Sequence, residues 1–462
     1  MSPFEIKSGE TTHCVELNSG KKLTGHFKFD QRGIHAYIYS YENWFFLKTE
    51  PIVLLTEKNE VVSLHSVISG PPGNISRLID PVRTVYRQDI TSDIAVIGHD
   101  EWATTDKIKR VSFTVKHAEG LLRHQAKTEA LSRRRALDED DFSLYSEPIG
   151  EMMVRADYGV TYSSEFDFPT NIWPRFELEF NNGKTLYNYV HHTGCYVQFL
   201  SFSLGVRLKP SDIRISRNSR EEMMMAGKKL YSGDHKVNYV WPEVEIDTRN
   251  IWVGGSPVCA WDDEELFVLR QCVVSWIARN SEWANAYALM MTSLTSRGEI
   301  SATRLIIACK WFEEIPLTKP ENAISEEDIN EIATVAAEKA SELGYKSAIF
   351  RRIAGSLKSI RTESHEHRFS RLIRRVRQRF GYSILPENVV LHLRHAIEFR
   401  GRAAHGHFNP ADRAERRAFS KAIHAMEAFC YLLTALELPI HEAGLKRVQR
   451  NPVIRDYLDA YE

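Results

Sequence analysis

The chain has almost no net charge. Its 60 lysines and arginines balance 61 aspartates and glutamates, which leaves a formal net charge of −1 over 462 residues. No overall field therefore draws it to nucleic acid or to a membrane, and any electrostatic partner must bind a local cluster. The chain also lacks an apolar run near the ~20 residues that cross a bilayer. Its first residues lack the basic and then apolar pattern of a signal peptide, so we expect a cytoplasmic protein with no membrane partner.

The chain has few cysteines, and their spacing matches no known disulfide or metal-binding motif. The six cysteines are scattered, and none forms a CxxC or a Cys/His pattern with zinc-ligand spacing, which indicates reduced thiols in the cytoplasm. His191, His192 and Cys195 lack an apparent fourth ligand, so we interpret them as a strand end with polar residues and predict no metal site there. No P-loop, GxSxG or HExxH motif is present. We therefore predict no cofactor.

Residues 1–245 have the pattern of short antiparallel strands. Phe176, Leu178 and Phe180 alternate with glutamates, as in a half-buried strand. Asn18 to Gly20 and Asn181 to Lys184 predict hairpin turns, and the aromatic run 195–208 is interpreted as another strand. One short helix is expected over 220–228. Many short strands at this spacing favour an antiparallel, β-sandwich-like N-terminal half.

Apolar residues at helical spacing dominate after residue 262. Proline and glycine separate the predicted helices, which are 263–279, 282–296, 300–315, 325–343, 345–360, 366–379, 387–404, 410–437 and 440–460. The fold class is therefore α+β multidomain. We predict a β-rich domain over 1–245, a linker over 246–262 with a hinge at 254–257, and an all-α domain over 263–462.

The most specific motif is Arg400-Gly401-Arg402-Ala403-Ala404-His405-Gly406-His407. The helix that carries it must end before Asn409, because the residue before Pro410 disfavours the α conformation. Asn409 is the expected cap of the next helix, with Pro410 first and Asp412 in its first turn. Residues 405–408 are thus the predicted exposed join between two helices.

Arginine and histidine at this join suit RNA cleavage. Histidine transfers protons near neutral pH, and arginine stabilises the extra charge of a phosphorane. Arg400 and His405 would act on the 2′-OH and its phosphate, giving 2′,3′-cyclic phosphate and 5′-OH ends without a metal. Arg402 and His407 have the same spacing and offer a second register, and they and Glu398 are auxiliary candidates.

The spacing raises a geometric question. Residues five apart on an ideal helix point ~140° apart, since each residue turns ~100°. Arg400 and His405 converge only if the helix ends or distorts near Gly401 or Gly406, or if a second copy of the chain supplies one of them. The second alternative predicts a homodimer.

A basic segment precedes the motif, over residues 346–379. Such clustering in a near-neutral chain predicts a face that binds RNA phosphates. The candidate residues on it are Arg368, Arg371, Arg374, Arg375, Arg377 and Arg379. The alternative is that the acidic segment 321–342 neutralises this face. His365 to His367 is interpreted as a solvated helix start.

The motif resembles the RxxxxH signature of HEPN-domain ribonucleases, and the order of a β-rich half and a helical half resembles ApeA-type anti-phage defence proteins. The resemblance covers about 300–440 well and 1–245 only by domain order. It implies an all-α HEPN bundle, catalysis by Arg400 and His405, a homodimeric site, and RNA, with tRNA as the expected class, as substrate. It further implies abortive anti-phage defence and a phage-derived protein as trigger. This chain has Gly401 where the family usually has a polar residue.

The predicted function is a metal-independent endoribonuclease whose N-terminal domain senses or restrains. Two alternatives remain open from other classes. One is a catalytically silent HEPN-like adaptor that binds RNA or protein. The other is a β-type ligand-binding module with a helical oligomerisation domain.

Overall fold

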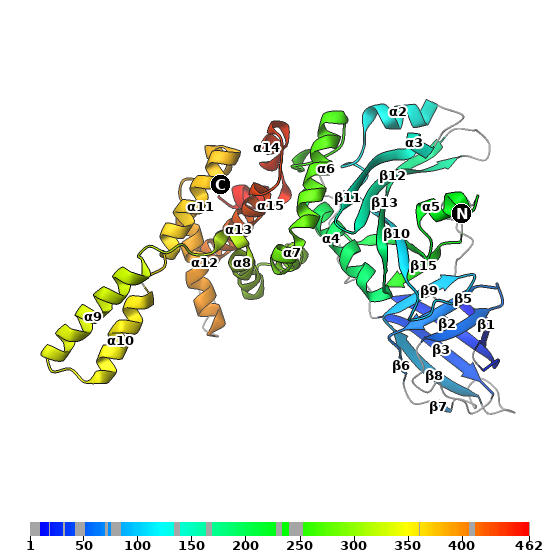
Figure 1. The fold of residues 1–462 in the computed structure, drawn as a ribbon, viewed down its shortest axis with the longest axis horizontal. Helices are drawn as coiled ribbons and strands as arrows, with labels where there is room; N and C mark the ends of the chain where they lie inside the picture. Colours follow the sequence, from blue (N-terminus) through cyan, green and yellow to red (C-terminus); the bar gives the residue numbers. More distant parts are fainter. Residues whose placement is uncertain are drawn as a thin grey trace. The chain divides into compact units, whose positions relative to one another are not determined.

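The structure is a computed structural model of the 462-residue chain (Figure 1). It describes residues 10–17, 19–30, 33–41, 51–69, 73–74, 85–133, 139–162, 169–227, 233–239, 253–359, 361–405 and 412–461. The contacts divide the chain into two compact units. The first comprises residues 1–200, 208–247 and 259–277, and the second comprises 201–207, 248–258 and 278–462.

Every strand of the first unit pairs antiparallel with its neighbours, as the sequence predicted. The strands are β1 (Glu10–Glu16), β2 (Lys22–Asp30), β3 (Gly33–Ser40), β4 (Ile52–Thr56), β5 (Val61–His65), β6 (Ile68–Ser69), β7 (Gly73–Asn74), β8 (Tyr86–Ser92), β9 (Ile94–Gly98), β10 (Ile108–Val115), β11 (Ser143–Ile149), β12 (Met152–Tyr162), β13 (Pro169–Lys184), β14 (Pro210–Ser216) and β15 (His235–Tyr239). Within the described residues they join in the order β11-β12-β13-β10-β14-β15-β9-β5-β4-β1-β2-β3-β8-β6, with β7 beside β8.

Helices accompany this sheet within the first unit. They are α2 (Gln125–Arg133), α3 (Glu139–Phe142), α4 (Leu186–Leu204), α5 (Arg220–Met225) and α6 (Asp263–Ala278). The predicted short helix near 220–228 is confirmed as α5, which begins with a Ser219 capping box. The predicted hairpin around residues 18–20 is confirmed by the pairing of β1 with β2.

Two strand predictions are wrong. The run 195–208 lies mostly in α4, and Asn181 to Lys184 continues β13 up to the start of that helix instead of turning back. A helix that is apolar and aromatic on most of its faces shows little helical periodicity, so its residues resemble a buried strand. Tyr196 on α4 packs on Phe176 of β13 at a ring distance of 5.0 Å, which explains the excess of aromatic residues.

The two faces of the central strands differ in chemistry. Val111, Phe113 and Phe176 face one side and are fully buried. Buried charges occupy the other side, where Arg110 donates to Asp234 at 2.7 Å and lies 3.6 Å from Glu177. Burial raises the pKa of both carboxyls, Glu177 and Asp234, and nearby arginines oppose that rise.

The second unit is helical, and helices follow residue 262 as predicted, but the first of them, α6, groups with the first unit and not with the predicted all-α domain. The elements of the second unit are η2 (Val253–Gly255), α7 (Asn280–Thr295), α8 (Ala302–Glu314), η3 (Pro316–Thr318), α9 (Glu326–Glu342), α10 (Ser347–Ser359), α11 (His365–Phe380), η4 (Tyr382–Ile384), α12 (Val389–Ala404), α13 (Arg413–Leu436), α14 (Glu442–Val448) and α15 (Pro452–Tyr461). The predicted helix 440–460 is two helices, because the buried Asn451 caps a new one that starts at Pro452.

Aromatic packing fixes the helices that position the motif. Phe312 of α8, Phe369 of α11 and Phe429 of α13 are buried, with ring centroids 5.2 to 6.1 Å apart. Figure 1 shows α9 and α10 as a pair lying side by side within this unit. No helix among the described residues combines the length and apolar character needed to span a membrane.

The described part of the predicted linker is packed. Gly255 approaches the main chain of Arg450 so closely that an added Cβ would lie 2.4 Å from its carbonyl oxygen. Arg447 also donates to the carbonyl of the buried Ser256 at 3.0 Å. These residues belong to the second unit, so the expected hinge at 254–257 is a fixed segment. Residues 240–252 lie outside the described residues.

Candidate functional site

Helix α12 carries the motif, and it is intact through Gly401. The His405 N–H donates to the Gly401 carbonyl at 3.3 Å, and His405 is the cap that follows the last helical residue, Ala404, with φ −93° and ψ 9°. The expected distortion at Gly401 is therefore absent. A continuous helix would point Arg400 and His405 ~140° apart, since each helical residue turns ~100°. Gly406 lies outside the described residues, so a second copy or a change beyond His405 remains to bring the pair together.

Arg400 is already engaged within the chain. Its guanidinium binds both carboxylate oxygens of Glu313 at the end of α8, with Nη2 3.2 Å from Oε2 and a shorter contact through Nη1. The Arg400 side chain is 28% exposed, so the pair is accessible to solvent. A phosphate would compete with Glu313 for the same forked donors. Sequence reasoning missed Glu313, because nothing in its local sequence marks it.

A histidine from the start of α11 lies in the same electrostatic environment. The rings of His365 and Phe369 are tilted against each other with centroids 6.2 Å apart, and Arg368 lies 4.7 Å above the ring of Phe312. Burial lowers the pKa of His365, and the positive charges of Arg368 and Arg400 lower it further, while Glu313 opposes them. The lowered pKa favours the neutral imidazole, which is the form that accepts a proton. The sequence placed it correctly at a helix start but not beside the motif.

The auxiliary candidates lie around the same helix end. Arg402 donates to Glu415 of α13 at 2.6 Å, and its guanidinium lies 5.6 Å from the centre of the Phe399 ring. Glu398 is exposed. His407, Asn409 and Pro410 lie outside the described residues, so the second register stays a prediction. Asp412, expected inside the first turn of α13, is instead its cap and accepts from the Glu415 N–H at 2.7 Å.

The α11 arginines are largely occupied within the fold. Arg371 pairs with Glu363 and lies 3.0 Å from Glu321, which realises the predicted neutralisation by acidic residues. Arg368 is buried against Phe312.

The C-terminal half of α11 contacts main-chain carbonyls. Arg377 donates to the Leu385 and Pro386 carbonyls at 3.3 and 3.1 Å. Arg379 donates to the Ile440 carbonyl at 2.8 Å. Arg374 and Arg375 remain exposed, with Arg375 3.6 Å from Glu437. The predicted phosphate face thus retains three of its six arginines as exposed groups, namely Arg374, Arg375 and Arg379, the last of which also donates to the Ile440 carbonyl.

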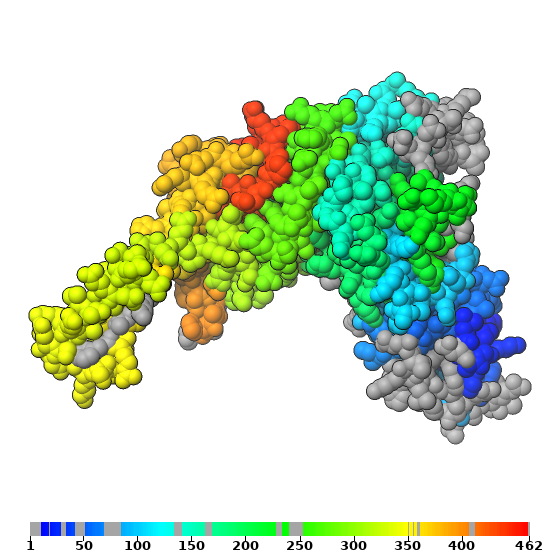
Figure 2. All heavy atoms as spheres, in the orientation of Figure 1, coloured from blue at the N-terminus to red at the C-terminus, as the bar shows by residue number. Residues whose placement is uncertain are grey.

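A second arginine group opens α13, and the sequence analysis did not single it out. Arg413, Arg416 and Arg417 are exposed and line a cavity of about 480 Å³. The signal was present as basic residues at i, i+3 and i+4, which share one helix face. Figure 2 shows α12, coloured orange, and the neighbouring second-unit helices at the molecular surface.

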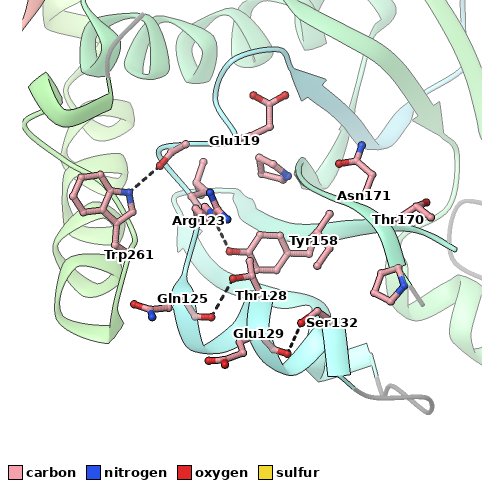
Figure 3. Close-up of a pocket in the computed structure, with 15 residues that line it drawn as sticks. Glu119, Arg123, Gln125, Thr128, Glu129, Ser132, Tyr158, Thr170, Asn171 and Trp261 are labelled. Carbon is pink, nitrogen blue, oxygen red and sulfur yellow. Dashed lines mark hydrogen bonds between the residues drawn. The ribbon is translucent and has the colours of Figure 1, made fainter. Parts of the chain in front are cut away.

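The first unit contains a larger, polar cavity of about 980 Å³ (Figure 3). Two aromatic rings border it and are fixed by hydrogen bonds. The Trp261 Nε1–H donates to the Gly120 carbonyl at 2.9 Å, and the Tyr158 hydroxyl accepts from the His124 N–H at 2.9 Å. Gln125 on α2 and Asn171 on β13 present carboxamides to the same space. This arrangement suits a neutral polar ligand with a flat face.

His191, His192 and Cys195 lie on α4, not at a strand end as expected. Burial lowers the pKa of His192 to about 4. Within the described part of the chain, no group of three or more His, Cys, Asp or Glu side chains is arranged to hold a metal ion.

Comparison with protein-family models, with curated proteins and with solved structures found no match to this chain.

Proposed function

We propose that this protein is a metal-independent endoribonuclease of the HEPN type. The observation that carries the proposal is the position of Arg400 and His405, which both lie at the solvent-accessible end of one intact helix. That helix packs on α13 through Phe399 and Phe419, whose rings are 5.6 Å apart. A phosphate-binding group and a proton-transfer group are thus held at the surface of a packed helical unit, where a long substrate can reach them.

The chemistry follows from these two groups. A base removes the proton of an RNA 2′-OH, and the freed oxygen attacks the adjacent phosphorus. The bond from phosphorus to the 5′-oxygen breaks, and an acid protonates that leaving oxygen. His405 transfers a proton in this scheme, and Arg400 stabilises the phosphorane with forked hydrogen bonds. DNA lacks the 2′-OH and is not cut.

A homodimer completes the site in this proposal. Because α12 has no break at Gly401, the helical phase up to its last residue, Ala404, favours a site to which each chain contributes one of the two motif residues. A second copy would place its His405 against the Arg400 of the first chain. Each dimer then contains two composite sites related by symmetry.

The wider role is abortive anti-phage defence. In this proposal the helical unit has the HEPN bundle, the first unit has a sandwich-like fold and regulates it, tRNA is the substrate class, and a phage-derived protein is the trigger. Support comes from the motif and from the order of a β unit and a helical unit. Toxicity of the full chain compared with a first-unit deletion, with and without phage infection, measures that regulation. Equal toxicity under all conditions contradicts it.

The central experiment compares wild type with Arg400→Ala and His405→Ala. RNA ends are sequenced after incubation with and without EDTA. We expect cyclic-phosphate ends from wild type in both conditions and none from either variant. Arg394→Ala is the matched control, because Arg394 is an exposed arginine on the same helix that lies 3.5 Å from Glu366. Cleavage by both motif variants at the wild-type rate would refute the assignment.

Mixing the two inactive variants tests the dimer. A heterodimer of Arg400→Ala and His405→Ala chains has one composite site with both groups and one with neither. If the chains assemble at random, half the dimers are of this kind, and about a quarter of wild-type activity returns. No recovery would place both groups in one chain.

A second candidate function rests on the polar cavity of the first unit. Its hydrogen-bonded aromatic rings and its carboxamides favour a ligand-binding module that recognises a sugar or nucleoside. A panel of both ligand classes in a thermal-shift assay tests it. The expected result is a rise in melting temperature that Gln125→Ala and Asn171→Ala abolish. RNA binding without cleavage would instead favour the adaptor alternative.

A further inference from the structure

The first three arginines of α13 form one surface. Arg413, Arg416 and Arg417 lie at i, i+3 and i+4, and Ser420 follows one turn later on the same face. All three arginines are exposed. Together with Ile300 and Ala302 they enclose the cavity of about 480 Å³. The cavity is therefore lined by three exposed guanidinium groups and by apolar residues that include the buried Phe419.

No acid in the described part of the chain neutralises these charges. None of the three guanidiniums has a hydrogen-bond or ion-pair partner among the described residues. Glu415, the nearest acid along the helix, is bound by Arg402 at 2.6 Å. Asp412 is used to cap the Glu415 N–H. Three like charges within about one helical turn repel one another, and a bound anion removes that cost.

The start of α8 adds to the same positive potential. Ala302, which lines the cavity, is the first residue of that 13-residue helix, and Ser301 is its cap. The unpaired amides and the dipole of a helix N-terminus favour an anion.

The cavity walls are held rigidly. Arg304 of α8 is fully buried and pairs with Glu427 of α13 at 2.6 Å. Ser293 donates to the same carboxylate at 2.5 Å. The two helices that frame the cavity are therefore fixed to each other, and the arginines project from a preformed scaffold.

The cavity is also connected to the motif. The Arg402–Glu415 ion pair and the Phe399–Phe419 ring contact join the end of α12 to the first turns of α13. Glu415 is the immediate neighbour of Arg416 in the chain. A polyanion bound at the arginines therefore passes beside the end of α12.

We propose that Arg413, Arg416 and Arg417 form a binding site for the backbone phosphates of RNA, which holds the substrate strand beside Arg400 and His405. The inference rests on the proposed ribonuclease function for its choice of ligand. Three guanidiniums with no base-reading groups around them recognise phosphate charge, not sequence. Cleavage specificity must then come from elsewhere in the protein.

The test measures binding apart from cleavage. A full-length His405→Ala background prevents turnover, and fluorescence anisotropy with a 5′-labelled tRNA reports affinity over a series of salt concentrations. Arg416→Glu with Arg417→Glu is compared with Arg374→Glu with Arg375→Glu. Both pairs are adjacent, exposed and on helices of the second unit, and both change the net charge equally.

The α13 reversal is expected to weaken binding at least about tenfold, and the slope of log affinity against log salt should fall by about 1.4 for two lost contacts on a single strand. The α11 reversal should weaken binding less than about threefold, through the long-range field alone. Arg416→Gln with Arg417→Gln, which removes charge without adding any, should show an intermediate loss. Thermal unfolding and circular dichroism of each variant establish that it is folded.

Equal or larger losses from the α11 reversal would overturn the inference, as would a complete lack of RNA binding in the His405→Ala background. Failure of the proposed function is distinguishable from this. If wild type binds tRNA through the α13 arginines and yields no cleaved ends, the ribonuclease assignment fails and the binding site stands. If cleavage is present and the α13 reversal leaves both affinity and salt slope unchanged, only the binding site fails.

Discussion

The arginines of α11 and those that open α13 are alike in sequence and differ in surroundings. On α11, Arg371 meets acids, Arg377 meets main-chain carbonyls and Arg368 covers an aromatic ring. On α13, Arg416 and Arg417 face a cavity with no partner in the described part of the chain. The denser cluster is thus the more structural one, and the sparser cluster is the better candidate for binding.

The comparison shows that the density of arginines along the sequence does not reveal which guanidinium groups can bind a phosphate. A guanidinium satisfied by an internal carboxylate has little left to give a phosphate, because the gain of the new contact is offset by the loss of the old one. An unpaired guanidinium loses no internal contact when it binds a phosphate. The useful property is therefore the number of unsatisfied donors on a shared face, which depends on tertiary contacts.

The largest expected effect is on the cleavage rate, through His365 at the start of α11. If His365 accepts the proton of the 2′-OH, His365→Asn lowers the cleavage rate about a hundredfold. Because a base acts when neutral and the pKa of His365 is lowered, wild-type activity should be lost only as pH falls below the usual histidine range of ~6.5. The pH–rate profile of His365→Asn should lack this limb. His367→Asn, two residues along the same helix, is the control, and a shared profile would exclude His365 from proton transfer.

The next effect is on stability through α11. Arg368→Ala should lower the free energy of unfolding by about 2 kcal/mol, because the buried stem and its cation–π contact with Phe312 are both lost. Chemical denaturation measures this. Arg368→Met keeps much of the apolar contact and should recover part of the loss. A stability within error of wild type for Arg368→Ala would mean that this arginine is not structural.

A smaller effect is expected at Arg371, which is only partly buried. Arg371→Ala should cost about 1 kcal/mol, since its ion pairs with Glu363 and Glu321 are partly solvated. A double-mutant cycle with Glu363→Gln isolates the pair energy. Strictly additive losses would show that the two side chains do not interact in solution.

The smallest effect on stability is expected on α13. Arg416→Ala should change the free energy of unfolding by less than about 0.5 kcal/mol, because no described contact is removed. The same variant should still weaken tRNA binding. A destabilisation as large as that of Arg368→Ala would remove the distinction between the two clusters.

The positions of the helices along the chain were predicted better from the sequence than the positions of the strands. The predicted helices from residue 263 to 437 begin and end within a few residues of the observed bounds, because their apolar stripes and breakers are local signals, whereas the predicted helix 440–460 is two helices. The errors at α4 and at residues 181–184 have one cause. An apolar, aromatic segment that is buried on most sides has no hydrophobic periodicity in its sequence. Only its packing on the sheet then decides that it forms a helix and not a strand.

The candidate site was predicted in part. Arg400 and His405 were named from spacing and composition, and their helix lies where expected. Glu313 and His365 were not linked to Arg400, because they come from other helices and no local pattern connects them. The intact helix at Gly401 likewise depends on the main-chain hydrogen bond from His405, which glycine content alone does not exclude.

The sequence by itself determined which residues are chemically able to act, since side-chain type decides proton transfer and phosphate binding. It also determined the helices of the second unit, because helical periodicity is local. Tertiary structure alone decided which arginines are free, because an internal partner for Arg371 or Arg377 comes from a segment that folding brings near. The same physics made Arg416 and Arg417 available, because folding placed a helix N-terminus beside them and gave them no acidic partner among the described residues.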